Sequence, residues 1–200
     1  MRRFVHGWCC FALIFLGLMP CTAAVRAQAP TPPLAAPSDA ARAQQLDALF
    51  ARLKATKDEA EGETIVAEIW QLWLQSGNAE IDEAMQRAVL AMGRVPALAL
   101  PILDDIVARA PQWAEGWNKR ATVLYLLGEH DRSLADIDRV LALEPRHFGA
   151  LAGIGLIRMD KGESRQALAA FRRALAVNPF LKERLGLIPA LEKEIGEKPI

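Results

Sequence analysis

The segment WNKRATVLYLLGEHDRSLADIDRVLALEP (Trp117–Pro145) is followed by LAGIGLIRMDKGESRQALAAFRRALAVNP (Leu151–Pro179), and the two segments match at a spacing of 34 residues. The matched positions are Trp117 with Leu151, Ala121 with Gly155, Gly128 with Gly162, Leu134 with Leu168, Leu141 with Leu175 and Pro145 with Pro179. Pro111 stands one further period before Pro145. A fixed period of this length is typical of a helical repeat array.

Each segment is predicted to form two helices joined by a tight turn. Apolar residues recur at helical spacing in both halves of the first segment: Trp117, Ala121 and Leu124, then Leu134, Ile137 and Leu141. Glycine follows the first helix at Gly128 and Gly162, where a left-handed C-cap favours this residue. Proline ends the second helix at Pro145 and Pro179, because it lacks an amide hydrogen and its ring clashes with the preceding turn.

On these landmarks the chain resembles the tetratricopeptide-repeat family, and specifically an exported bacterial member. The residues that carry the resemblance are Trp117, Ala121, Gly128, Leu134 and Pro145, then Leu151, Gly155, Gly162, Ala167, Phe171, Ala174 and Pro179. It covers about Glu80 to Pro179 and implies an all-α fold, a right-handed α–α superhelix of helix pairs with capping helices at both ends. The alternative, an ordinary helical bundle with chance spacing, leaves the fixed period unexplained.

The period divides the chain into seven parts. We expect a signal peptide over 1–27, a Pro/Ala-rich linker over 28–39, an N-terminal divergent helix pair over 40–79, a weak repeat over 80–113, two clear repeats over 114–147 and 148–181, and a C-terminal capping helix and tail over 182–200.

The first segment has the features of a secretory signal peptide. Arg2 and Arg3 precede an apolar run from Trp8 to Met19, which is shorter than the roughly 20 residues that span a bilayer. We expect cleavage after Ala27, with Ala29 as a second candidate, and hence a periplasmic or secreted protein without a stable membrane span. The alternative is an uncleaved membrane anchor. All three cysteines lie in this segment, so the mature chain would contain no thiol or disulfide.

The flanking regions follow the repeat pattern less closely. A helix is expected from near Ala40 and a second from about Glu63 to Gln75, after a charged break at Lys57–Gly62; this pair is either a divergent repeat or an N-terminal cap. In the weak repeat, Pro101 should bend the second helix or delay its start. After Pro179, an apolar and charged stretch over 180–195 is expected to form a polar-backed cap, split or kinked near Gly186 and Pro189.

The sequence shows no catalytic motif, and we predict a protein that is not an enzyme and has no cofactor or metal. His130 and His147 both stand at turns without metal-pair spacing, and we expect both to be surface residues. The formal charge is zero, which gives no indication of nucleic-acid binding. Asp104–Asp105 and the Asp136/Asp138 pair are expected to lie on a solvated face or to pair with Arg109 and Arg139.

The family resemblance implies that the first helices of the repeats line a concave, partner-binding wall. On that pattern the predicted site residues are Asn118, Thr122, Tyr125, Ala152, Leu156 and Met159, with Ala84, Ala88 and Met92 extending the row. Such a wall suits a peptide or protein segment. The alternative is that these side chains only pack against the neighbouring helix. The carboxylate clamp of chaperone-binding members is not carried over, because only Asn118 fits it.

Two arginines and several tryptophans leave alternatives open. Arg120 and Arg158 stand where the family usually has apolar side chains; we expect each to pair with a local acid such as Asp136 or Asp160, or to reach solvent, rather than to bind an anion in the groove. Trp113 is expected to act as a hydrophobic staple or as an exposed partner contact.

Three functions remain in order of preference. The first is an adaptor of the cell envelope that binds a protein through the concave face. The second is a structural protein that self-associates through its open ends or the Trp70/Trp73 face. The third is an enzyme, which lacks support because no nucleophile–base or metal constellation is visible.

Overall fold

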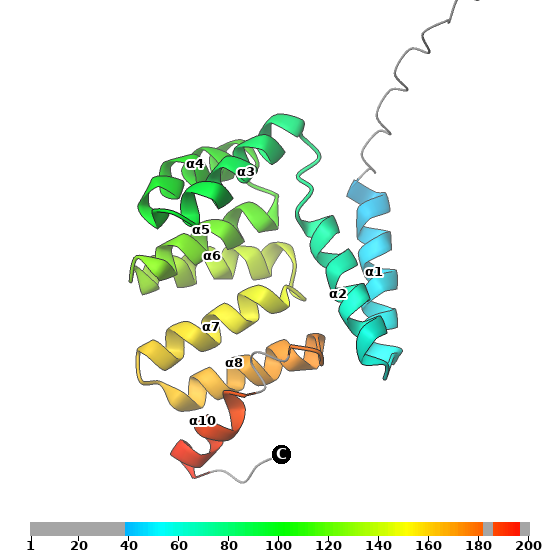
Figure 1. Ribbon diagram of the computed structural model, residues 1–200, viewed down its shortest axis with the longest axis vertical. Helices are drawn as coiled ribbons and strands as arrows, with labels where there is room; N and C mark the ends of the chain where they lie inside the picture. Colours follow the sequence, from blue (N-terminus) through cyan, green and yellow to red (C-terminus); the bar gives the residue numbers. More distant parts are fainter. Residues whose placement is uncertain (1–38, 182–185, 197–200) are drawn as a thin grey trace, which may run out of the picture. The chain divides into compact units, whose positions relative to one another are not determined.

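The computed structural model describes residues 39–181 and 186–196, and within them every regular element is an α-helix (Figure 1). The predicted signal peptide, most of the predicted linker and the extreme C-terminus therefore lie outside the described residues. The helices are α1 (Asp39–Ala55), α2 (Glu59–Trp73), α3 (Ala79–Met92), α4 (Pro96–Arg109), α5 (Ala114–Leu126), α6 (His130–Leu143), α7 (Phe148–Asp160), α8 (Ser164–Val177) and α10 (Ile188–Ile195). None of the described helices is long and apolar enough to cross a membrane.

Three helix pairs, α3–α4, α5–α6 and α7–α8, stack in chain order (Figure 1). Within each pair the helices pack on each other, and α4 packs on α5 as α6 packs on α7. The all-α fold class predicted from the repeat period is confirmed. One hairpin alone cannot bury its apolar side, so this stacking is what supplies the core.

The repeat landmarks occupy the positions that close packing requires. Phe171, Ala167 and Ala174 of α8 are fully buried. A Cβ added to Gly155 of α7 would lie 2.4 Å from the Phe171 ring, so only glycine permits this approach of the two helices. After α5 and α7 the chain turns through a glycine in the left-handed region, with φ of 76° at Gly128 and 70° at Gly162. The other landmarks, Pro145 and Pro179, follow the C-caps of α6 and α8.

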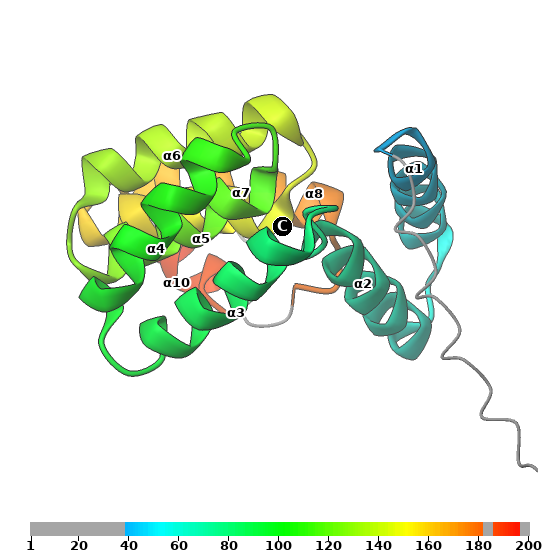
Figure 2. The same cartoon turned by 90° about the horizontal axis from the view of Figure 1, so that it is seen from above.

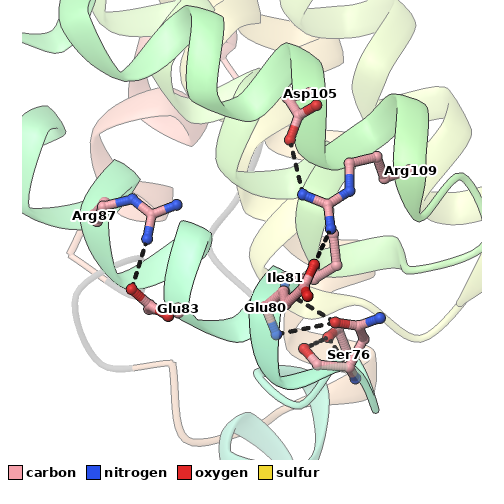
Figure 3. Close-up of polar contacts among 8 residues, drawn as sticks. Ser76, Glu80, Ile81, Glu83, Arg87, Asp105 and Arg109 are labelled. Atoms are coloured by element: carbon pink, nitrogen blue, oxygen red, sulfur yellow. Dashed lines mark hydrogen bonds and ion pairs between the residues drawn. The ribbon is translucent and has the colours of Figure 1, made fainter.

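The exposed side of α3 carries charged side chains beside the exposed apolar side chain of Leu90. Glu83, which replaces the landmark tryptophan, forms an ion pair with Arg87 at 2.9 Å on the exposed side of the helix (Figure 3). Arg109 of α4 binds both Asp105 and Glu80, as Figure 3 also shows. These charged pairs are suited to solvent at the end of the stack, where α3–α4 is the first repeat.

The second helix of the weak repeat continues through its internal proline. Helix α4 starts at Pro96, where the missing amide hydrogen costs nothing, and extends through Pro101 to Arg109. The start is therefore not delayed, contrary to one of the two expectations. Ala99, Leu103 and Ile106 are buried at the register expected from the 34-residue period.

The α1–α2 hairpin lies beside the stack rather than on top of α3 (Figures 1 and 2). Helix α2 begins at Glu59, not near Glu63, because Asp58 caps it by accepting a hydrogen bond from the Glu61 amide. Gly62 is therefore not a helix breaker. It is buried within α2, where a Cβ would lie 2.5 Å from the Phe180 ring.

The hairpin packs against the loops that join successive repeats. Trp113, His147 and Leu181 are spaced by the 34-residue period, and all three contact it. The Trp113 indole Nε1 donates to the Trp73 carbonyl oxygen at 2.8 Å, the His147 ring stacks on Trp73 at 4.1 Å between centroids, and Leu181 joins the apolar cluster of the hairpin. The expectation of a divergent repeat or cap did not anticipate this side-on position.

The C-terminal helix packs on α8 and covers the last repeat. Ile188 and Leu191 of α10 are buried in the same cluster as Phe171. Helix α10 begins only at Ile188, after a turn at Gly186 and Leu187, and Pro189 lies in its first turn, where proline is favourable and does not kink the helix. Residues 182–185 of the expected cap lie outside the described residues.

Candidate functional site

A groove of about 170 Å³ lies between α5 and α7 on the side predicted to be concave. Its lining residues are Asn118, Ala121, Thr122, Tyr125, Ser133, Ile137, Gly149, Ala150, Gly153, Leu156 and Ile157. Four of the six predicted site residues are therefore brought together here. The other two do not line the groove. Ala152 is buried and Met159 is half-buried, and both pack in the apolar cluster with α8. For these two residues the alternative interpretation, packing against the neighbouring helix, is the correct one.

The groove owes its width to glycines on α7. Gly149 and Gly153 line it without side chains. At Gly149 a Cβ would lie 2.9 Å from the ring of Trp70 in α2, so the hairpin reaches the end of the groove. Among the side chains that line the groove, Thr122 is exposed and Tyr125 and Leu156 are half-buried. A bound molecule can therefore contact these three side chains.

A buried polar network closes the end of the groove nearest the hairpin. Glu115 of α5 is 1% exposed and His147 is fully buried. The Ala150 backbone N–H donates to His147 Nδ1 at 3.1 Å, so Nδ1 is unprotonated and the neutral ring carries its hydrogen on Nε2. That Nε2–H lies 3.1 Å from Glu115 Oε2, and the Asn118 amide nitrogen donates to the same oxygen at 2.8 Å.

The Glu115 carboxylate is ionised in this setting. Burial alone would raise its pKa, but the hydrogen bond from His147 and the positive charge of Lys119 outweigh burial and lower the pKa below its ordinary value of 4.5. Lys119 Nζ lies 2.8 Å from Glu115 Oε1 and 5.6 Å from the centre of the Trp70 ring. Oε2 thus has two hydrogen-bond donors, whereas Oε1 makes the ion pair with Lys119 and accepts no hydrogen bond within the described residues.

The expectation that His147 is a surface residue is wrong. The side chain is enclosed by Trp73, Trp70 and Phe148, and it caps α7 through Nδ1. The 34-residue period could have indicated that His147 is buried, because the equivalent positions hold the apolar residues Trp113 and Leu181. His130 differs: it is half-buried at the start of α6, stacked on Tyr125 with ring centroids 5.8 Å apart.

The two arginines pair with local acids, as expected. Arg120 makes two 2.8 Å hydrogen bonds to the buried Asp136 and one of 2.9 Å to Asp104. Arg158 pairs with Glu163 rather than with Asp160. Neither arginine lines the groove, so neither supplies an anion site there.

The remaining candidates have structural positions. Trp113 is buried at the N-cap of α5 and is not an exposed contact. Trp73 is buried and Trp70 is half-buried in the hairpin core, so the Trp70/Trp73 face is used within the chain. Asp105 pairs with Arg109 as expected, whereas Arg139 lies 6.0 Å over the Trp117 ring. In residues 39–181 and 186–196 no group of three His, Cys, Asp or Glu side chains could hold a metal ion.

The stacked helix pairs, their 34-residue landmarks and the groove on their first helices define an α-solenoid repeat protein. No family model matches the chain. It is 42% identical over 138 residues to a TPR repeat-containing protein of Rhizobium etli, an alignment that spans 68% of this chain and 67% of that protein. The chain belongs to the tetratricopeptide-repeat family, as the sequence indicated.

Other relatives agree with this fold. Human Superkiller complex protein 3 is 24% identical over 127 residues, which cover 62% of this chain and 8% of that protein. Among solved structures, the Sgt2 TPR domain from Aspergillus fumigatus superposes with a TM-score of 0.55 at 19% identity, covering 62% of this chain and 87% of that domain. A crystal structure of MamA gives 0.54 at 18% identity, covering 58% and 68%. The family generally provides non-enzymatic scaffolds for protein–protein interaction.

Proposed function

We propose that this chain is a non-enzymatic adaptor of the bacterial cell envelope, which binds a peptide or protein segment in the groove between α5 and α7. The observation that carries the proposal is the groove itself, where Thr122, Tyr125 and Leu156 surround a hollow of about 170 Å³. A single apolar side chain of a partner fits a hollow of this size, with the rest of the segment lying along α5.

The other faces of the repeat stack are less suited to the same role. Helix α10 covers α8, and the hairpin covers the inter-repeat loops. The exposed side of α3 carries the Glu83–Arg87 pair beside the exposed Leu90, and end-to-end stacking of copies would have to remove these two charges from water. Self-association through the Trp70/Trp73 face would require the hairpin core to open. Binding a segment in the groove requires no such rearrangement.

Export to the periplasm or beyond is part of the proposal and is supported by the sequence features of residues 1–27. N-terminal sequencing of the protein purified from the bacterial envelope tests this part. A mature chain that begins at Gln28 supports export with cleavage, and a full-length chain in the cytoplasm contradicts it.

Binding is tested by crosslinking capture with the mature chain and two matched double variants. Thr122→Ala with Tyr125→Ala alters the groove. Leu90→Ala with Leu98→Ala alters exposed apolar side chains of α3 and α4 outside it. We expect the groove variant to lose a partner that the wild type and the control variant both retain. Equal capture by all three proteins, or loss with the control variant alone, contradicts the proposed site.

A further inference from the structure

We infer that the groove presents hydrogen-bond acceptors to its occupant and therefore selects an extended peptide segment through the segment's backbone N–H groups. This inference rests on the proposed function, because it assigns the chemistry of the same site. It depends on the directions of the hydrogen bonds that end at Asn118 and Thr122, which line the groove on α5 together with Tyr125.

The direction of each bond in the buried network follows from one fixed donor. The Ala150 backbone N–H can only donate, so His147 Nδ1 accepts and His147 Nε2–H donates to Glu115. The Glu115 carboxylate can only accept. Asn118 must therefore turn its amide nitrogen toward Glu115, as the 2.8 Å contact shows.

This orientation leaves the Asn118 carbonyl oxygen, Oδ1, for the groove. Within the described residues Oδ1 accepts no hydrogen bond. It is also not one of the side-chain atoms that are buried from solvent without a hydrogen-bond partner. Thr122 is fixed in the same sense: its hydroxyl donates to the Asn118 backbone carbonyl at 2.9 Å, so the lone pairs of Thr122 Oγ1 remain. Thr122 is exposed, so an occupant can reach this oxygen.

The spacing of the two acceptors suits an extended peptide. Asn118 and Thr122 are four residues apart on α5, which places them about 6 Å apart along the helix axis. N–H groups on one edge of an extended strand recur every second residue, at about 6.6–6.8 Å. One edge of a bound segment can thus donate to both oxygens, while an intervening side chain enters the hollow near Leu156 and Gly153.

The polarity fixed at Asn118 and Thr122 disfavours another ligand class. A terminal carboxylate or a phosphate needs donors, and both fixed side chains on the α5 wall offer acceptors instead. Lys119, the nearest cation on α5, is paired with Glu115. The buried pair Glu115–His147 is therefore a positioning element: it touches no occupant but sets what Asn118 offers.

The experiment uses two small probes with the full mature chain, because no natural ligand is identified. N-acetyl-L-alanyl-L-leucine methylamide carries two backbone N–H donors on one edge, that of alanine and that of the terminal methylamide, with leucine between them. Its analogue methylated at those two nitrogens keeps the leucine side chain and has no donor on that edge. Binding is followed at millimolar concentration by two-dimensional amide spectra, reading the backbone N–H signals of Gly149 and Gly153. We expect the donor probe to bind about fivefold or more tightly than the methylated probe, since one or two hydrogen bonds separate them.

Two variants test the origin of this preference. Thr122→Val removes an exposed acceptor without touching the buried network, and it should reduce the preference for the donor probe severalfold. Glu115→Gln can donate as well as accept, so it frees Asn118 to reverse and should also reduce the preference. If the glutamine variant does not fold, the valine variant decides alone.

The outcomes separate this inference from the proposed function. Equal binding of both probes at the groove, or an unchanged preference in Thr122→Val, overturns the inferred polarity and leaves the site in place. If neither probe shifts the Gly149 and Gly153 signals, both the polarity and the proposed site are wrong. A donor preference that falls in Thr122→Val supports both.

Discussion

Replacing His147 with alanine should be among the most destabilising single changes outside the apolar core. The ring is fully buried and takes part in three interactions. It caps α7 by accepting from the Ala150 amide, worth about 1 kcal/mol; it donates to the buried Glu115 carboxylate, worth roughly 1.5–3 kcal/mol; and it stacks on Trp73, worth roughly 0.5–1.5 kcal/mol. We therefore expect His147→Ala to lower the free energy of unfolding by about 3–5 kcal/mol.

The matched control is His130→Ala, which changes the other histidine of the described residues. Its side chain is 24% exposed, and its nearest ionic contact, Asp160, lies 3.7 Å away. We expect a loss below about 1 kcal/mol for this variant. Urea unfolding followed by circular dichroism measures both. If His147→Ala costs no more than His130→Ala, the buried network described above is wrong.

Three further predictions concern packing and pH. Gly155→Ala should lower the free energy of unfolding by about 1–3 kcal/mol, because the new Cβ would lie 2.4 Å from the buried ring of Phe171. Gly153→Ala, whose Cβ would have its nearest contact at 3.2 Å, should be neutral or stabilising by up to about 1 kcal/mol. Equal melting temperatures of the two variants would contradict this difference. The pKa of Glu115 is lower in the folded protein than its ordinary value, so its ionised form contributes stability above about pH 4.5, and this contribution is lost as the pH falls through the folded pKa. The difference in unfolding free energy between the wild type and Glu115→Gln should therefore shrink on acidification. A difference that grows on acidification would contradict the lowered pKa. Gly62→Ala should disturb the contact with Phe180 and speed amide exchange in α1 and α2 but not in α5, an effect absent if the hairpin is held elsewhere.

The repeat period predicted the stack because repeats record the same packing several times. Ala121 and Gly155, or Gly128 and Gly162, recur for one physical reason each, close helix approach and a left-handed turn. The hairpin has no such repetition, so its place beside the inter-repeat loops was not visible. Gly62 illustrates the difficulty: a glycine that permits contact with Phe180 looks in sequence like a helix breaker.

The groove residues were partly predictable and the network behind them was not. Helical spacing places Asn118, Thr122 and Tyr125 on one face of α5 regardless of tertiary contacts. The burial of Glu115 and His147 depends on α2 covering the loop between α6 and α7, a contact between residues far apart in the chain. A turn histidine is ordinarily exposed, and here Trp70 and Trp73 of α2 cover it.

Site-specific photocrosslinking in growing cells tests the binding face most directly. A photoreactive benzoylphenylalanine is placed at Tyr125 in the groove or, as control, at Leu98, which is 62% exposed on α4. We predict a discrete crosslinked species from position 125 that is absent from position 98 and is reduced by Thr122→Val in the same chain. Crosslinks from position 98 with none from position 125 would show that partners bind another face and that the groove is not the site.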